Sequence, residues 1–86
     1  MGLQVSIRQS ADVIIVDLQG RATIGRSNDL LSSQLRKLIE DGTREVLLNL
    51  VGLMQLDSSS LSTIARAFVS LVHEGGSLKL LRPAAW

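Results

Sequence analysis

The residues of this sequence that could do chemistry gather in one run, Asp57-Ser58-Ser59-Ser60. The run lies between an apolar segment and a segment with helical spacing, so it suits the start of a helix. There, carboxylate and hydroxyl oxygens accept hydrogen bonds from the free N–H groups of the first turn. The same unpaired N–H groups and partial positive charge would also tolerate a phosphate on one of the serines. The run therefore predicts either a helix cap or a phosphorylatable docking turn.

A catalytic interpretation is weaker. A serine nucleophile needs a base, and the only histidine is His73. If Ser58 and His73 lie on one helix, about 1.5 Å of rise per residue separates them by about 22 Å. His73 is better explained as a solvent-facing residue near a helix C-terminus. The sequence also lacks carboxylate pairs, metal-ligand spacings and a glycine-rich phosphate loop, so we expect no enzyme, metal or cofactor. Weak nucleotide binding at the helix start stays open.

The composition argues against a nucleic-acid partner. Nine basic and eight acidic residues leave a net charge of +1 in the 86-residue chain, and Phe68 and Trp86 are its only aromatic residues. Neither a basic footprint nor a platform for stacking bases is available. The basic residues alternate with acidic ones and indicate a solvated face: Arg21, Arg26, Arg36, Lys37 and Arg44.

The length and the apolar runs favour one intracellular domain. No apolar run approaches the ~20 residues that cross a bilayer. The first residues lack the apolar core of a secretory signal, and the chain has no cysteine. We therefore expect a cytoplasmic protein.

The elements that must position the serine run can be predicted from periodicity. Alternation from Leu3 to Ile7 and the β-branched run from Val13 to Leu18 predict two antiparallel strands, with Gly20 ending the second. A helix should start at Ser27 or Asn28 and run to about Asp41. Its apolar stripe consists of Leu31, Leu35, Leu38 and Ile39.

The second half of the chain repeats a strand and a helix. The sequence predicts a strand over 46–50, a short loop through Gly52, a helix after Asp57 and a last strand over 78–81. The buried stripe of this helix should be Leu61, Ile64, Ala65, Phe68 and Val72. The resulting order, β-β-α-β-α-β, predicts an α/β fold with helices packed on a mixed sheet whose last strands are parallel.

Three segments together resemble a known family: Val-Leu-Leu-Asn-Leu, then Leu-Asp-Ser-Ser-Ser-Leu-Ser-Thr-Ile, then Glu-Gly-Gly-Ser-Leu-Lys-Leu-Leu. They are similar to the STAS domain of sporulation- and stress-type anti-sigma factor antagonists. The resemblance implies a STAS-like fold and a single domain over residues 1–86. It also implies a domain truncated at its C-terminus, because the usual helix after the last strand is lacking.

The resemblance further implies a phosphorylation-controlled binding module. In that family the unphosphorylated domain binds an anti-sigma factor that is also a serine kinase, which releases the sigma factor. The kinase then phosphorylates the serine after the motif aspartate, here Ser58 with Ser59 as the alternative, and a phosphatase resets it. The implied partner-binding residues are Asp57, Ser58, Ser59, Ser60 and Thr23. Ser60 replaces the usual glycine, so we expect its side chain to crowd either a kinase active site or the approach of the partner.

Two further expectations follow from this resemblance. The alternative function is a non-switching STAS scaffold or accessory domain, as in a stressosome, an anion-transporter tail or a lipid-transport complex. The surface left uncovered by the lacking helix should drive homodimerisation, with Trp86 as an interface anchor.

Overall fold

The computed structural model describes residues 2–22 and 25–82. These residues form a four-stranded sheet and two helices in the order β-β-α-β-α-β, as predicted. The elements are β1 (Leu3–Ser10), β2 (Val13–Ala22), α1 (Arg26–Glu40), β3 (Glu45–Leu56), α2 (Ser58–His73) and β4 (Ser77–Leu81). Thr23 and Trp86 lie outside the described residues.

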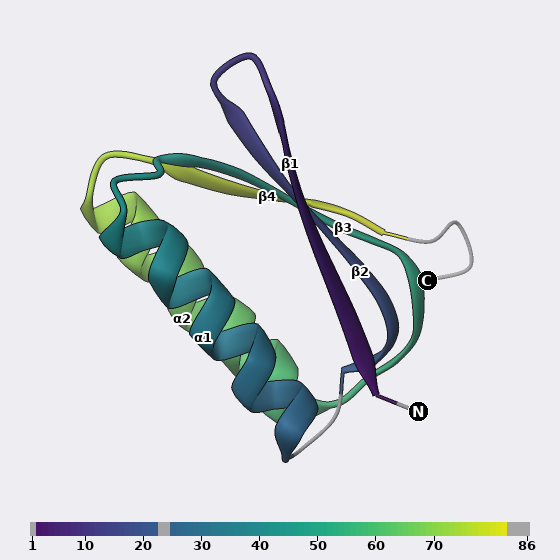
Figure 1. Ribbon diagram of the computed structural model, residues 1–86. Coiled ribbons are helices and arrows are strands. Elements are labelled where there is room, and N and C mark those ends of the chain that lie inside the picture. Colours follow the sequence, from purple (N-terminus) through teal and green to yellow (C-terminus); the bar gives the residue numbers. More distant parts are fainter. Residues whose placement is uncertain (1, 23–24, 83–86) are drawn as a thin grey trace.

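The sheet is mixed, with the order β1-β2-β3-β4. β1 pairs with β2 in antiparallel orientation, whereas β2, β3 and β4 are mutually parallel. Figure 1 shows α1 and α2 side by side on one face of this sheet, with their starts at the same end. Each helix connects two parallel strands, so the carboxyl ends of β2 and β3 lie next to the starts of both helices.

An aliphatic core joins the helices to the sheet. Val16, Leu18 and Leu48 are almost completely buried on the covered face of the sheet. Leu31 and Leu35 of α1 pack against them, with Leu38 and Ile39 partly buried at the margin. The stripe predicted for α1 is therefore confirmed.

The stripe predicted for α2 is wrong for most of its members. Of the predicted residues only Ile64 is buried, while Leu61, Phe68 and Val72 are 53%, 47% and 51% exposed, and Ala65 is exposed too. The face on the sheet consists of Ser60, Thr63, Ile64, Ala67 and Leu71. Small and polar residues are part of this buried face, where α2 packs against the sheet and α1. A second face of α2, which is apolar, points outward.

Two strands run further than the glycines suggested. β2 continues through Gly20 to Ala22, and β3 continues through Gly52 to Leu56 in place of the predicted loop. Gly20 lies at a register shift with φ +97°, and a Cβ there would meet the Gly2 carbonyl oxygen at 2.4 Å. The glycine therefore permits a bulge and a close strand approach instead of ending the strand.

The predicted cap of α1 is also wrong. The helix begins at Arg26, its N-cap is Gly25, and no side-chain hydrogen bond caps it within the described residues. Ser27 and Asn28 lie inside the first turn. The φ of +93° at Gly25 is a conformation that glycine adopts readily, so the glycine sets the entry angle of the chain.

The opposite face of the sheet carries a polar ladder. Arg8 Nε lies 2.7 Å from Asp17 Oδ2, and Asn49 Nδ2 donates to Asp17 Oδ1 at 2.7 Å. These hydrogen bonds from Arg8 and Asn49 hold the pKa of Asp17 below its usual value. The ladder thus joins β1, β2 and β3 across the face that the helices leave open.

Candidate functional site

The serine run lies at the junction of β3 and α2, as predicted. Asp57 is the N-cap residue of α2, with an extended backbone (φ −96°, ψ 177°). Its N–H donates to the carbonyl oxygen of Ala22 at 3.1 Å, which fixes the turn against the end of β2. Thr23, for which a partner-binding role is predicted, follows Ala22 and lies outside the described residues.

Asp57 is the residue that caps the helix. Its Oδ1 accepts one hydrogen bond from the Ser60 N–H at 3.0 Å and another from Ser59 Oγ at 2.8 Å. This is the N-cap geometry expected of an aspartate, and such a cap contributes about 1 kcal/mol. The capping interpretation of the run is therefore confirmed, and it accounts for Asp57 and Ser59.

Ser58 and Ser59 differ in how available their hydroxyl groups are. Ser58 is the first residue of α2, it is exposed, and its hydroxyl makes no hydrogen bond to any described residue. Ser59 is partly buried, and its hydroxyl donates to Asp57. The arrangement presents one accessible nucleophilic oxygen beside a carboxylate, at the positive end of a helix.

Ser60 faces the interior. Its side chain is 0% exposed, and its Oγ has no hydrogen-bond partner among the described residues. The roles expected for Ser60 at a partner or kinase surface stay predictions, and the burial of its side chain argues against them. Only its backbone N–H belongs to the turn, through the bond to Asp57.

Thr63, for which the sequence predicted no role, connects the turn to α1. Thr63 Oγ1 donates to Asn28 Oδ1 at 2.7 Å and lies 3.2 Å from the carbonyl oxygen of Ser59. Asn28, predicted as a cap, thus crosslinks the two helices near their starts. The predicted buried stripe of α2 did not include Thr63, so no pattern in the sequence indicated that its hydroxyl would be buried and would need a partner.

The geometry offers no catalytic pair or metal site within residues 2–22 and 25–82. Ser58 and His73 are the first and last residues of α2, which is 16 residues long, so their side chains lie at opposite ends of the helix. No group of three potential metal-ligating side chains occurs in that part of the chain. No described helix is long and apolar enough to cross a membrane.

An apolar hollow of about 440 Å³ opens beside the turn. It lies between the start of α2 and the carboxyl ends of β3 and β4, and Met54, Leu61 and Leu80 are among its lining residues. Met54 is 76% exposed and Leu61 is 53% exposed. Exposed apolar side chains around a hollow are typical of surfaces that bind another protein.

Comparisons with known proteins agree with this geometry. The model of the STAS domain family matches residues 4–85. The structure is similar to that of the anti-sigma factor antagonist SpoIIAA in its unphosphorylated form, with a TM-score of 0.79 and 18% identity over 96% of this chain and 74% of that one. An anti-sigma factor antagonist from Mycobacterium paratuberculosis gives 0.78 and 18% over 92% of this chain and 66% of that one.

A third similar structure belongs to a longer protein. A crystal structure of Mglu gives a TM-score of 0.78 and 24% identity over 92% of this chain, but this chain spans only 19% of that one. At these identities the structural likenesses show a shared fold. They do not transfer a partner or a residue role.

Proposed function

Because the chain belongs to the STAS domain family, we propose that it is an anti-sigma factor antagonist controlled by phosphorylation. In this proposal the unphosphorylated protein binds an anti-sigma factor that is also a serine kinase and so releases the sigma factor. It acts in the cytoplasm as one STAS module, by binding and not by catalysis. The observation that carries the proposal is the exposed Ser58 hydroxyl beside Asp57 at the start of α2.

The physical basis of the switch is a local change of charge. A phosphate on Ser58 adds about −1.5 to −2 next to the −1 of Asp57, while the helix start tolerates the added charge. A partner that covers the turn and inserts side chains into the hollow at Met54 and Leu61 would have to desolvate or repel that charge. The complex is therefore stable only before phosphorylation.

Two observations support Ser58 over Ser59 as the phosphorylated residue. The Ser58 side chain is exposed and its hydroxyl forms no hydrogen bond to the described residues, so a kinase can reach it at no structural cost. Phosphorylation of Ser59 would remove its hydrogen bond to Asp57 and would place a dianion against that carboxylate.

Incubation with the serine kinase of the source organism and ATP, followed by mass spectrometry, tests the proposal. The expected product carries one phosphate on Ser58, which a cognate phosphatase removes. Ser58→Ala should abolish incorporation, while the matched variant Ser59→Ala should retain it. Phosphate on Ser59 alone, or none on either serine, would reject the assignment.

The alternative is a non-switching scaffold or accessory domain. It is favoured by the observation that Asp57 and Ser59 are already used in capping α2. The affinity for the partner distinguishes the two functions. A scaffold would bind the partner equally well as wild type and as Ser58→Asp, whereas a switch would bind it more weakly as Ser58→Asp.

We also propose that the outer face of α2 mediates self-association with a second copy of the chain. Phe68, Val69 and Val72 are 47%, 64% and 51% exposed on this face, which is away from the serine turn. A patch on one helix can pair with itself across a two-fold axis. Light scattering should detect a dimer that Phe68→Ser weakens, and a monomer at all concentrations would contradict this proposal.

A further inference from the structure

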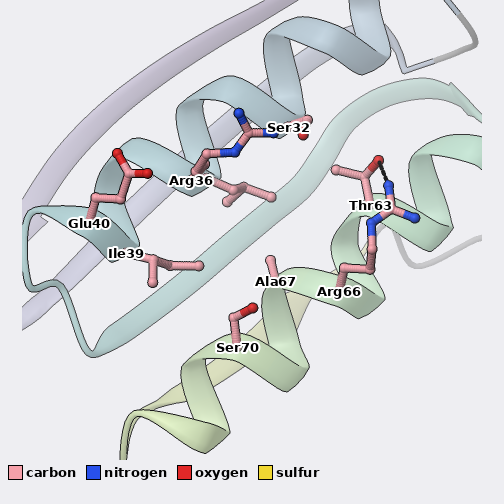
Figure 2. A pocket seen from close by; sticks show the side chains of 9 residues that line it. Ser32, Arg36, Ile39, Glu40, Thr63, Arg66, Ala67 and Ser70 are labelled. Carbon is pink, nitrogen blue, oxygen red and sulfur yellow. Dashed lines mark hydrogen bonds between the residues drawn. The ribbon is translucent and has the colours of Figure 1, made fainter.

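A groove of about 190 Å³ runs between α1 and α2 (Figure 2). Its floor is apolar and includes Leu35 and Ala67, whereas its walls carry hydroxyl and guanidinium groups from both helices. Arg36 comes from α1 and Arg66 from α2, so two elements far apart in the sequence bring the charges together. This groove is separate from the apolar hollow beside the serine turn.

Neither arginine is neutralised by a carboxylate. Arg36 makes no ion pair or hydrogen bond with any described residue. Arg66 Nη2 donates only to Thr63 Oγ1, at 3.3 Å. Glu40 also lines the groove, but within residues 2–22 and 25–82 it forms no ion pair with either arginine.

The neighbouring Lys37 behaves differently. Like the two arginines it is exposed, but it pairs with Asp41 at 3.5 Å. Two unpaired cations that line one groove repel each other, and an anion between them would remove that repulsion.

The two guanidinium groups and the hydroxyl groups of Ser32 and Thr63 lie toward one end of the groove, whereas Glu40 and Ser70 lie toward the other (Figure 2). In Figure 2 the Arg36 side chain reaches toward Ser32, away from Glu40, and the Arg66 guanidinium lies beside Thr63. A guanidinium offers a planar fork of donors that matches an oxyanion, and hydroxyl groups add further donors. The bond from Arg66 to Thr63 also orients one fork, and Thr63 is in turn fixed by Asn28.

We infer that the groove between α1 and α2 binds a small phosphate-bearing molecule, whose phosphate Arg36 and Arg66 hold from opposite helices. The hydroxyl group of Ser32 adds a further donor, while Thr63 orients Arg66 and donates its own hydroxyl to Asn28. The volume of about 190 Å³ is below that of pockets for drug-sized ligands, which fits a phosphate with a short carbon body. The apolar floor at Leu35 and Ala67 receives that body.

The same chemistry could come from a phosphoserine in a peptide, but the geometry favours a free molecule. A peptide must carry its backbone across the ridges of both helices, whereas a small molecule enters the groove whole. This site does not depend on the function proposed for Ser58, since none of its side chains belongs to residues 57–60.

Titration of the intact protein with inorganic phosphate at constant ionic strength, followed by NMR, tests the inference. Saturable shifts should appear at Ser32, Arg36, Thr63 and Arg66. Arg36→Gln and Arg66→Gln should each weaken phosphate binding about tenfold or more, as expected for a lost charged hydrogen bond. Lys37→Gln removes the same charge outside the groove and should change the affinity less than about twofold.

Three results would overturn the inference. The first is that phosphate shifts only the NMR signals of residues 57–60. The second is that all three variants weaken phosphate binding equally, which would indicate nonspecific electrostatic attraction of phosphate to the surface. The third is tighter binding of a phosphoserine peptide than of glycerol phosphate, which would assign the groove to a protein partner. Unchanged amide spectra of the variants away from the groove show that each one still folds.

Discussion

Asp57 and Ser60, the first and last residues of the polar run, differ in whether their side chains form hydrogen bonds. The Asp57 side chain lies at the surface of the turn and accepts two hydrogen bonds, one of them from the Ser60 backbone. The Ser60 hydroxyl is buried without a partner among the described residues. A buried hydroxyl that loses its hydrogen bonds to water costs about 1–3 kcal/mol. We therefore expect the Ser60 hydroxyl to lower the stability of the fold.

Replacing Ser60 should stabilise the protein. We expect Ser60→Ala to raise the free energy of unfolding by about 1 kcal/mol or more, because it removes the unpaired hydroxyl. Ser62→Ala is the matched control, since Ser62 is exposed in the same helix and reports the helix propensity of alanine alone. Urea denaturation measures both variants. A Ser60→Ala protein that is less stable than Ser62→Ala would contradict the burial of an unpaired hydroxyl.

Asp17 should make stability depend on pH in the acid range. Its pKa is lowered in the folded protein by hydrogen bonds from Arg8 and Asn49, so the unfolded chain binds a proton more readily than the folded one. The contribution is complete above the ordinary value of 3.8 and is lost as the pH falls through the lowered value. The wild type should exceed Asp17→Asn in stability at pH 7, and the difference should vanish at low pH.

Urea denaturation at a series of pH values measures this difference. Asp12→Asn, in the exposed turn between β1 and β2, is the control. A constant difference between wild type and Asp17→Asn at all pH values would show that the ladder does not depend on the carboxylate charge.

At the scale of elements, α2 shows what the sequence could and could not predict. The helix, its start at Asp57 and its end before the glycine pair follow from capping and periodicity. The buried face does not, because apolar residues lie on two faces of α2. Ile64 belongs to both the predicted and the observed buried face. The small residues Thr63 and Ala67 belong to the observed face, which packs against the sheet and α1. Hydrophobicity alone cannot choose between two apolar faces when close packing favours small side chains.

Contacts between strands that are distant in the sequence could not be predicted for a different reason. The ladder of Arg8, Asp17 and Asn49 depends on the register of three strands, which no local pattern specifies. The extension of β3 through Gly52 likewise depends on its pairing with β2. By contrast, the order of the elements, the parallel last strands and the stripe of α1 follow from local periodicity and the rules of crossover connections.

Two matched substitutions test the orientation of α2. Leu71 is 0% exposed, so Leu71→Ala should lower the free energy of unfolding by about 2–5 kcal/mol. Phe68 is 47% exposed, so Phe68→Ala should cost clearly less despite removing the larger side chain. Denaturation at low protein concentration keeps self-association out of the comparison. A Phe68→Ala variant less stable than Leu71→Ala would indicate that the helix presents its other face to the sheet.

At the scale of the whole molecule, the topology gathers the serine turn and the apolar hollow at one end. Parallel β2 and β3 end where α1 and α2 begin (Figure 1), and the serine turn there lies next to the apolar hollow at Met54 and Leu61. The groove between the helices and the outer face of α2 are further surfaces on the helical side. A phosphate on Ser58 would alter only the first of these, so the switch needs no rearrangement of the fold.

The affinity for the anti-sigma factor kinase tests the central claim most directly. Calorimetry would compare the unphosphorylated protein with the same protein phosphorylated on Ser58, using Ser59→Ala as a control that keeps the phosphorylation site. The account predicts that phosphorylation weakens binding about 30-fold or more, because a buried charge without a partner costs at least about 2 kcal/mol. Ser58→Asp should weaken binding in the same direction. Equal affinities of the two forms would contradict the switch and favour a scaffold.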